Sequence, residues 1–300
     1  MKKTLLVFAA LLVAVSAFAG PQAEEELGTE ENPIVWAFVP SGDTNEIVAG
    51  GQEVADMIYD LTGLVVEVSV ATEYAGVIEA LSSDPPSAHM ASLATFSYVV
   101  AADRGVAQAA LVAERYGSPT YNGQIIANVN SGIDTLEDLV GATFARPDPL
   151  STSGWIIPML TMRAAGIDPD SDLEEIVDAG GHTGVVSAVY NGQADAGATF
   201  VDARANIQED SPDVMEVVKV IALTADIPND GVQFHPSVPA DIRRQIVDAL
   251  LQIAATDEGA EALGRAYEWD GLVARTDTFY DPFRQVLQAS GMTAEELAGE

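Results

Sequence analysis

The sequence contains no cysteine in its 300 residues. This absence excludes disulfide bonds, thiolate-bound zinc, iron–sulfur clusters and a cysteine nucleophile. It also removes the usual compositional sign of an oxidising compartment. The location of the protein therefore has to be predicted from other features.

Basic residues are scarce as well. Lysine and arginine together number 13 against 46 aspartates and glutamates, which gives a formal net charge of −33 at pH 7. Affinity for a polyanion depends mainly on basic side chains that neutralise phosphates, so this balance argues against nucleic acid as a partner. It argues against binding to an anionic membrane surface for the same reason.

Signatures of catalysis and of metal binding are also missing. The chain has no G-x-S-x-G, H-E-x-x-H, G-x-G-x-x-G or G-x-x-x-x-G-K-[ST] motif. Its three histidines, His89, His182 and His235, do not have the spacing of metal ligands. The sequence therefore predicts a protein that is not an enzyme and that uses no metal and no cofactor.

What is present begins with a pattern typical of a secretory signal peptide. Two lysines precede an apolar run from Leu5 to Val15, and the small-x-small motif Ala17-Phe18-Ala19 follows. The run is shorter than the ~20 residues of a membrane span, so we predict a signal peptide over residues 1–19. No cysteine stands at the cleavage point. The mature chain is thus predicted to be periplasmic, neither a lipoprotein nor otherwise anchored in a membrane.

Residues 20–32 are acidic and lack apolar periodicity, which predicts a disordered linker. After Pro33, short apolar runs alternate with segments of helical periodicity, which is typical of an α/β sheet with flanking helices. Strands are expected at 34–39, 64–70, 88–93, 111–114, 123–128, 142–145, 174–178, 194–199 and 217–223. Helices are expected at 74–81, 45–61, 97–104, 153–165, 184–190, 240–255, 258–266 and 282–289.

The order of these segments predicts two α/β lobes, each a mainly parallel sheet flanked by helices. Residues 33–122 and 226–300 make up the first lobe, and residues 123–225 form a second lobe inserted into it. The chain is expected to cross between the lobes near Tyr121–Gln124 and Leu223–Pro228. A hinge at these crossings would close the lobes around a ligand in the cleft between them.

Three consecutive hydroxyl residues, Ser151, Thr152 and Ser153, stand at the start of the predicted helix 153–165. The free N–H groups and the positive dipole end of a helix favour an anion, and three hydroxyls add donors without a lysine. The alternative interpretation is a plain serine N-cap, the commonest reason for serine at such a place.

A second stretch places glycines around a histidine, in Gly180-Gly181-His182-Thr183-Gly184. Glycine lets the backbone approach a ligand closely, and a histidine in a loop can donate to an oxyanion. A lone histidine is more often a packing or surface residue, so this stretch does not decide the function by itself.

From about Pro33 to Pro282 the chain resembles the substrate-binding proteins of phosphate, phosphite and phosphonate ABC transporters, a branch of the type II periplasmic binding proteins. The segments that carry the resemblance are Ile34–Pro40, Tyr74 with Val77–Leu81, Tyr121 with Gln124–Ala127, Leu136–Gly141, Asp148–Pro158, His182–Gly197 and Ile227–Asp230. The resemblance implies the two-lobed fold of that branch, with the ligand in the cleft between the lobes.

In that family the Ser-Thr-Ser hydroxyls hold the phosphorus oxyanion, so the resemblance assigns this role to Ser151, Thr152 and Ser153. It further implies ligand contacts from His182, Asp230, Asp202, Tyr74 and Tyr121. The segment 88–98 departs from the family, because it lacks the aspartate and the Gly-Pro step often found before the equivalent tyrosine.

The role of Asp230 next to an anion has three interpretations. It can accept the proton of a P–OH group, or it can bind the amine of an aminoalkyl phosphonate. The third interpretation is structural, because Pro228-Asn229-Asp230-Gly231 is a strong turn signal.

The resemblance implies an extracytoplasmic protein that captures a phosphonate, phosphite or phosphate and delivers it to the permease and ATPase of an ABC importer. We expect it to act as a monomer. Two alternatives share the fold: binding of another solute such as a sulfonate or a thiamine precursor, and ligand sensing for a two-component kinase. A serine hydrolase built from Ser151, His182 and Asp202 is disfavoured, because the serine does not lie in a nucleophile elbow.

Overall fold

The computed structural model describes residues 26–298 of the chain. The predicted signal peptide, residues 1–19, and the first part of the predicted linker lie outside the described residues. Residues 26–32 form a turn in which the Gly28 N–H donates to the Asn32 carbonyl at 2.8 Å, while the Gly28 carbonyl accepts from Val65 at 2.8 Å. Leu27 packs against the core. This end of the linker is therefore ordered, because its one leucine and its backbone have partners in the first lobe.

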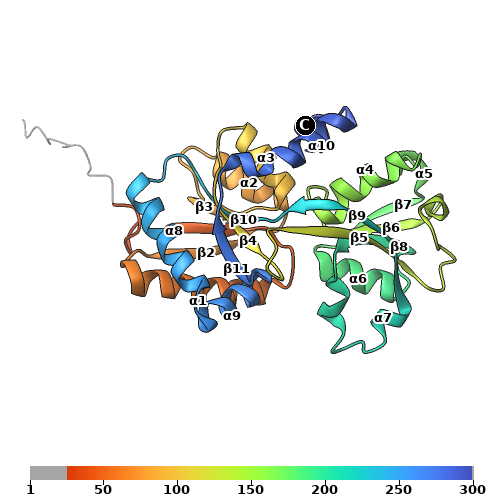
Figure 1. Ribbon diagram of the computed structural model, residues 1–300, viewed down its shortest axis with the longest axis horizontal. Helices are drawn as coiled ribbons and strands as arrows, with labels where there is room; N and C mark the ends of the chain where they lie inside the picture. The colour runs from red at the N-terminus through yellow and green to blue at the C-terminus, as the bar shows by residue number, and fades with distance from the viewer. Residues whose placement is uncertain (1–25, 299–300) are drawn as a thin grey trace, which may run out of the picture.

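Two sheets lie at opposite ends of the molecule's long axis (Figure 1). Their strand orders are β11-β4-β10-β3-β1-β2 and β7-β6-β8-β5-β9. The strands are β1 (Ile34–Phe38), β2 (Val66–Val70), β3 (Met90–Ser92), β4 (Gln108–Glu114), β5 (Thr120–Asn128), β6 (Thr143–Arg146), β7 (Glu175–Asp178), β8 (Ala196–Phe200), β9 (Val218–Pro228), β10 (Gly231–Phe234) and β11 (Gly271–Ala274).

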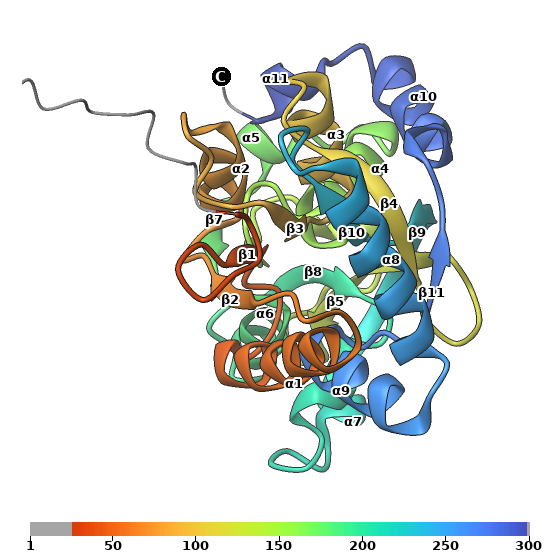
Figure 2. The ribbon, with the colours of Figure 1, turned by 90° about the vertical axis from the view of Figure 1, so that its left-hand side faces the viewer.

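Helices flank both sheets, as the alternating pattern predicts (Figures 1 and 2). They are α1 (Thr44–Thr62), α2 (Tyr74–Ser82), α3 (Thr95–Asp103), α4 (Ile157–Ala164), α5 (Pro169–Asp172), α6 (His182–Tyr190), α7 (Val214–Val217), α8 (Ala240–Ala254), α9 (Asp257–Tyr267), α10 (Asp281–Ser290) and α11 (Ala294–Ala298), with the short helical turns η1 (Leu136–Leu139), η2 (Thr152–Ile156), η3 (Ala203–Ile207) and η4 (Asp277–Tyr280).

The pairing of the strands confirms the two-lobed α/β fold and makes both sheets mixed. β1 pairs in parallel with β2 and β3, and β6 does so with β7 and β8. β10 and β11 add antiparallel pairs to the first sheet. The sequence did not predict these two strands, because each begins at the glycine of an Asp-Gly pair, which indicates a turn.

Two long strands connect the lobes. β5 follows β4 of the first sheet but belongs to the second, and β9 leads back from the second sheet to β10. They pair in antiparallel fashion from Thr120 opposite Pro228 to Asn128 opposite Val218. The lobe boundaries predicted at 122/123 and 225/226 fall within these two strands. The second lobe is thus entered and left through adjacent strands.

Helix α1 shows how local sequence and packing position the first lobe. Its N-terminus is capped by Asp43, which accepts hydrogen bonds from the amides of Asn45 and Glu46 at 2.8 and 3.2 Å. Where α1 crosses α9, a β-carbon on Gly50 would lie 2.5 Å from the Ala266 nitrogen, so only glycine permits this approach. Figure 2 shows α1 and α9 on one side of the first sheet and α2 and α3 on the other.

The buried apolar side chains form one large core cluster that draws on both lobes, and a smaller cluster next to α6. Trp36 and Phe144, one from each lobe, belong to the large cluster. A core shared in this way ties the two lobes together. Within residues 26–298, none of the helices is both long enough and apolar enough to cross a membrane.

Candidate functional site

A cleft of about 1600 Å³ separates the two lobes. Residues 41–46 and 264–270 line it from the first lobe, and residues 151–153 and 200–202 line it from the second. All eight predicted site residues line this one cleft: Tyr74, Tyr121, Ser151, Thr152, Ser153, His182, Asp202 and Asp230. The structure therefore brings together residues that the sequence spreads over more than half of the chain. Their contact with a ligand stays a prediction.

The three hydroxyl residues lie at the start of one continuous helical segment, in which the π-helical turn η2 runs into α4. Each is at most 2% exposed. Ser151 is the N-cap and accepts from the Gly154 amide at 3.2 Å, while the Thr152 hydroxyl accepts from the Phe96 amide of the first lobe at 2.8 Å. The amides of Thr152 and Ser153 belong to the first turn, where intrahelical acceptors are lacking. Ser151 is thus an N-cap, and the same turn still presents donors to the cleft.

Asp148 holds the Ser-Thr-Ser turn in place through hydrogen bonds to backbone amides. Its carboxylate accepts from the Leu150 amide at 2.7 Å and, across the cleft, from the Tyr74 amide at the N-terminus of α2 at 3.1 Å. Burial raises the pKa of Asp148, although both hydrogen bonds act in the opposite direction. The buried carboxylate therefore connects the Ser-Thr-Ser turn of one lobe to a helix N-terminus of the other.

His182 is the first residue of α6, and its ring lies between the hydroxyls of Ser151 and Thr199. Its Nδ1 is 2.8 Å from the Thr199 hydroxyl and its Nε2 is 3.5 Å from the Ser151 hydroxyl. Its backbone N–H donates to the Ser41 carbonyl of the first lobe at 3.0 Å. Burial, with a contribution from the Arg115 charge, lowers the pKa of His182 to about 3. The imidazole is therefore neutral at physiological pH, with one ring nitrogen as a donor and the other as an acceptor.

We expect this buried imidazole to make the protein sensitive to acid. Its folded-state pKa of about 3 lies below the ordinary 6.5, so the unfolded chain takes up the proton first as the pH falls. The neutral imidazole of His182 contributes its full stabilisation of the folded state above pH 6.5, and this contribution declines as the pH falls towards 3. Urea unfolding at about pH 7 and about pH 4 should show the stability gap between wild type and His182→Gln shrink by roughly 2–3 kcal/mol. Identical pH dependence in both proteins would contradict this.

The two tyrosines face the hydroxyl turn from the first lobe and from β5. Burial raises the pKa of Tyr74, and a hydrogen bond with Ser151 opposes the shift only in part. Burial and the charge of Asp230 raise the pKa of Tyr121 to about 12, against a hydrogen bond with Ser153. Both phenols are thus protonated at neutral pH and are available as donors to an anion.

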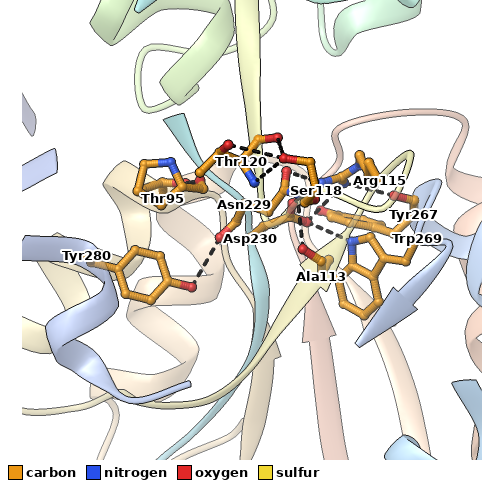
Figure 3. A network of polar contacts seen from close by, with 11 residues as sticks. Thr95, Ala113, Arg115, Ser118, Thr120, Asn229, Asp230, Tyr267, Trp269 and Tyr280 are labelled. Atoms are coloured by element: carbon orange, nitrogen blue, oxygen red, sulfur yellow. Dashed lines mark hydrogen bonds and ion pairs between the residues drawn. The ribbon is translucent and has the colours of Figure 1, made fainter. Parts of the chain in front are cut away.

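The two acidic site residues are each paired with an arginine. Asp230 receives Arg115 Nη1 on Oδ1 at 2.5 Å and the Trp269 indole N–H on Oδ2 at 3.0 Å (Figure 3). Asp202 receives Arg204 Nη2 on Oδ2 at 2.7 Å. Both carboxylates line the cleft, but neither is a free negative charge.

The cleft residues that sequence reasoning missed include Ser41, Arg115 and Tyr267. Arg115 carries a usable signal, because it is one of only 13 basic residues and directly follows a predicted strand at the lobe crossing. Tyr267 offers no such signal, since α9 carries it into the cleft from a distant part of the sequence. Within residues 26–298, no group of three or more His, Asp or Glu residues has the geometry of a metal site.

A two-lobed fold with a cleft between the lobes and two strands crossing between them defines a type II periplasmic binding protein. A family model described as the periplasmic substrate-binding protein of phosphonate ABC transporters matches residues 36–280. The chain therefore belongs to this family of extracytoplasmic transporter components, which confirms the resemblance drawn from the sequence.

Relatives with known names agree with this placement. The chain is 28% identical over 229 residues to the phosphonates-binding periplasmic protein of Escherichia coli, covering 75% of this chain and 67% of that protein. It is 29% identical over 202 residues to the phosphate-import protein PhnD of Mycolicibacterium smegmatis, covering 64% of this chain and 62% of that protein. The chain thus spans about two thirds of the length of both.

Solved structures share the fold. A binding protein component of an ABC phosphonate transporter from Pseudomonas aeruginosa has a TM-score of 0.78 at 23% identity, covering 89% of this chain and 92% of that one. A Prochlorococcus marinus protein in complex with methylphosphonate has a TM-score of 0.76 at 12% identity, covering 87% and 98%. At these identities the likeness concerns the fold alone.

Proposed function

We propose that the protein captures a phosphorus oxyanion, a phosphonate, phosphite or phosphate, in the interlobe cleft by hinge closure and delivers it to the permease of an ABC importer. The observation that carries the proposal is the buried Ser151-Thr152-Ser153 turn. Its hydroxyls and first-turn amides face a cleft in which the two predicted acidic site residues, Asp202 and Asp230, are each paired with an arginine. The named substrates of the two relatives, phosphonates and phosphate, support the same ligand class.

The proposed binding mode uses neutral donors. Ser153, Tyr74 and Tyr121 offer hydroxyls, and the helix start offers amides. Hydrogen bonds to a charged oxygen are strong in a buried site, so the net charge of −33 does not prevent the capture of an anion. In this proposal the protein works as a monomer in the periplasm after cleavage of its signal peptide, uses no cofactor or metal, and catalyses no reaction.

Removing one of the hydroxyls should weaken binding. We expect Ser153→Ala to reduce affinity for the best phosphorus ligand roughly ten- to hundredfold, because a hydrogen bond to a charged group contributes ~1.5–3 kcal/mol. Isothermal titration calorimetry with methylphosphonate, phosphite, phosphate and sulfate measures the change. Ser171→Ala, an exposed serine on α5 of the same lobe, is the matched control and should bind as wild type does.

Two results would count against the proposed function. One is tight binding of sulfate with no binding of any phosphorus oxyanion, which would favour another solute. The other is unchanged affinity in Ser153→Ala, which would limit the hydroxyl turn to a structural role.

A further inference from the structure

The two carboxylates that a cationic substituent would need are already engaged. Asp230 and Asp202 both line the cleft, Asp202 from the second lobe and Asp230 next to the crossing strand β9. Arg204 binds Asp202 through two nitrogens, Nε to Oδ1 at 2.8 Å and Nη2 to Oδ2 at 2.7 Å. Arg115 does the same to Asp230, with Nη1 to Oδ1 at 2.5 Å and Nη2 to Oδ2 at 3.3 Å.

Arg115 is held in this position by further contacts (Figure 3). Its Nη1 also donates to the Asn229 side-chain oxygen at 2.9 Å, and its Nη2 donates to the Tyr267 carbonyl at 2.9 Å. Asn229 in turn donates to the carbonyls of Ala113 and Ser118 at 3.0 and 2.9 Å. Burial is the largest single influence on Arg115 and lowers its pKa, but the charge of Asp230, the hydrogen bond to Asp230 and smaller contributions from Tyr121 and Glu268 together outweigh burial and leave the pKa raised. The guanidinium therefore stays charged and in place.

The pair leaves little room at Asp230 for a second cation. A carboxylate has roughly four acceptor positions, and the two Arg115 nitrogens and the Trp269 indole occupy three of them. The position left on Oδ1 suits a single neutral donor such as a P–OH group. Four other acids at the cleft accept hydrogen bonds from neutral donors: Asp43 from the Asn45 amide at 2.8 Å, Asp226 from Asn122 at 2.9 Å, Glu268 from Asn206 at 3.3 Å, and Asp270 from the Tyr116 amide. Glu46 and Asp210 also line the cleft.

We propose that Arg115 determines specificity, selecting phosphorus oxyanions without an ammonium group over aminoalkyl phosphonates by neutralising Asp230. An ammonium group entering this side of the cleft loses its water and meets a carboxylate whose charge is already balanced. A small oxyanion with one P–OH group exchanges its hydrogen bond to water for one to the remaining acceptor position on Asp230 Oδ1. This inference rests on the proposed function and narrows its ligand class.

Calorimetry with methylphosphonate and 2-aminoethylphosphonate tests the selectivity. For the wild type we expect methylphosphonate to bind at least tenfold more tightly. Arg115→Gln removes the balancing charge, so the ratio of the two affinities should move at least tenfold towards 2-aminoethylphosphonate. Arg243→Gln changes the net charge by the same amount on α8, away from the cleft, and should leave the ratio as it is in the wild type.

The outcomes separate this inference from the proposed function. If the wild type binds no phosphorus oxyanion, the proposed function fails. If it binds 2-aminoethylphosphonate as tightly as methylphosphonate, or if the ratio does not change in a folded Arg115→Gln protein, the role of Arg115 is overturned and the proposed function stands. Should Arg115→Gln not fold, Asp230→Asn leaves the Arg115 charge unbalanced at the cleft. It should move the ratio at least tenfold further towards methylphosphonate, and no movement would overturn the proposal.

Discussion

Replacing Asp230 with leucine is expected to destabilise the protein by about 3–5 kcal/mol, because it leaves the Arg115 charge buried without its partner. The Asp230 side chain is 9% exposed and that of Arg115 is 18% exposed, so water replaces the lost carboxylate only in part. The Trp269 indole loses its acceptor as well. At this chain length the change corresponds to a decrease in melting temperature of roughly 10 °C, which calorimetry or circular dichroism would detect.

The double variant Arg115→Met with Asp230→Leu is the informative control. Replacing both members of a buried ion pair by apolar residues is often neutral, so the double variant should be more stable than Asp230→Leu alone. A double variant that is less stable than either single one would show that the contacts of Arg115 to Asn229 and Tyr267, and not the ion pair, hold this region together.

Replacing Gly154 with alanine should damage both folding and binding. The added β-carbon would lie 2.3 Å from Cδ of Pro147 and 2.9 Å from the Ser151 hydroxyl oxygen. The proline ring cannot yield, so the turn that carries the three hydroxyls must shift. We expect a loss of ~1–3 kcal/mol in stability and roughly ten- to hundredfold weaker binding of the best phosphorus ligand, measured by urea unfolding and calorimetry.

Gly264→Ala is the matched control for this substitution. Gly264 lies in α9, and the nearest atom to an added β-carbon there is the Trp269 carbonyl oxygen at 4.0 Å. Alanine should therefore stabilise the helix slightly. If Gly154→Ala behaved in the same way, the Ser-Thr-Ser turn would not depend on close packing against Pro147.

The sequence predicts the elements of this fold well where their periodicity is strong. The apolar run at residues 34–39 becomes β1, and the amphipathic pattern at 45–61 becomes most of α1. It fails at β10 and β11, because each begins at the glycine of an Asp-Gly pair, which is a turn signal. The sequence also predicts mainly parallel sheets, whereas both sheets are mixed. The antiparallel pairing of β5 with β9 depends on contacts between segments that are distant in the sequence.

At the site, sequence patterns predict the residues that stand together in a local motif. They do not predict the partners that come from distant parts of the chain. The run at Ser151 is visible as three adjacent hydroxyls, whereas the neutralisation of Asp230 depends on Arg115 and Trp269, which lie far from it in the sequence. Asp230, for which the sequence left three interpretations open, forms an ion pair with Arg115 in the structure. No local pattern contains that information.

Because β5 and β9 lie side by side where they cross between the lobes, the second lobe can be exchanged as one segment of the chain. Asn122 and Asp226 are paired opposite each other, so the two ends of the inserted segment meet at one place. A relative's second lobe can replace this one at two junctions without rerouting any other connection. Such an exchange moves the hydroxyl turn and His182 together, and it leaves Arg115 and Asp230 behind. The hydroxyl turn and the Arg115–Asp230 pair can therefore evolve, and be engineered, independently, while Tyr74 and Tyr121 stay with the first lobe.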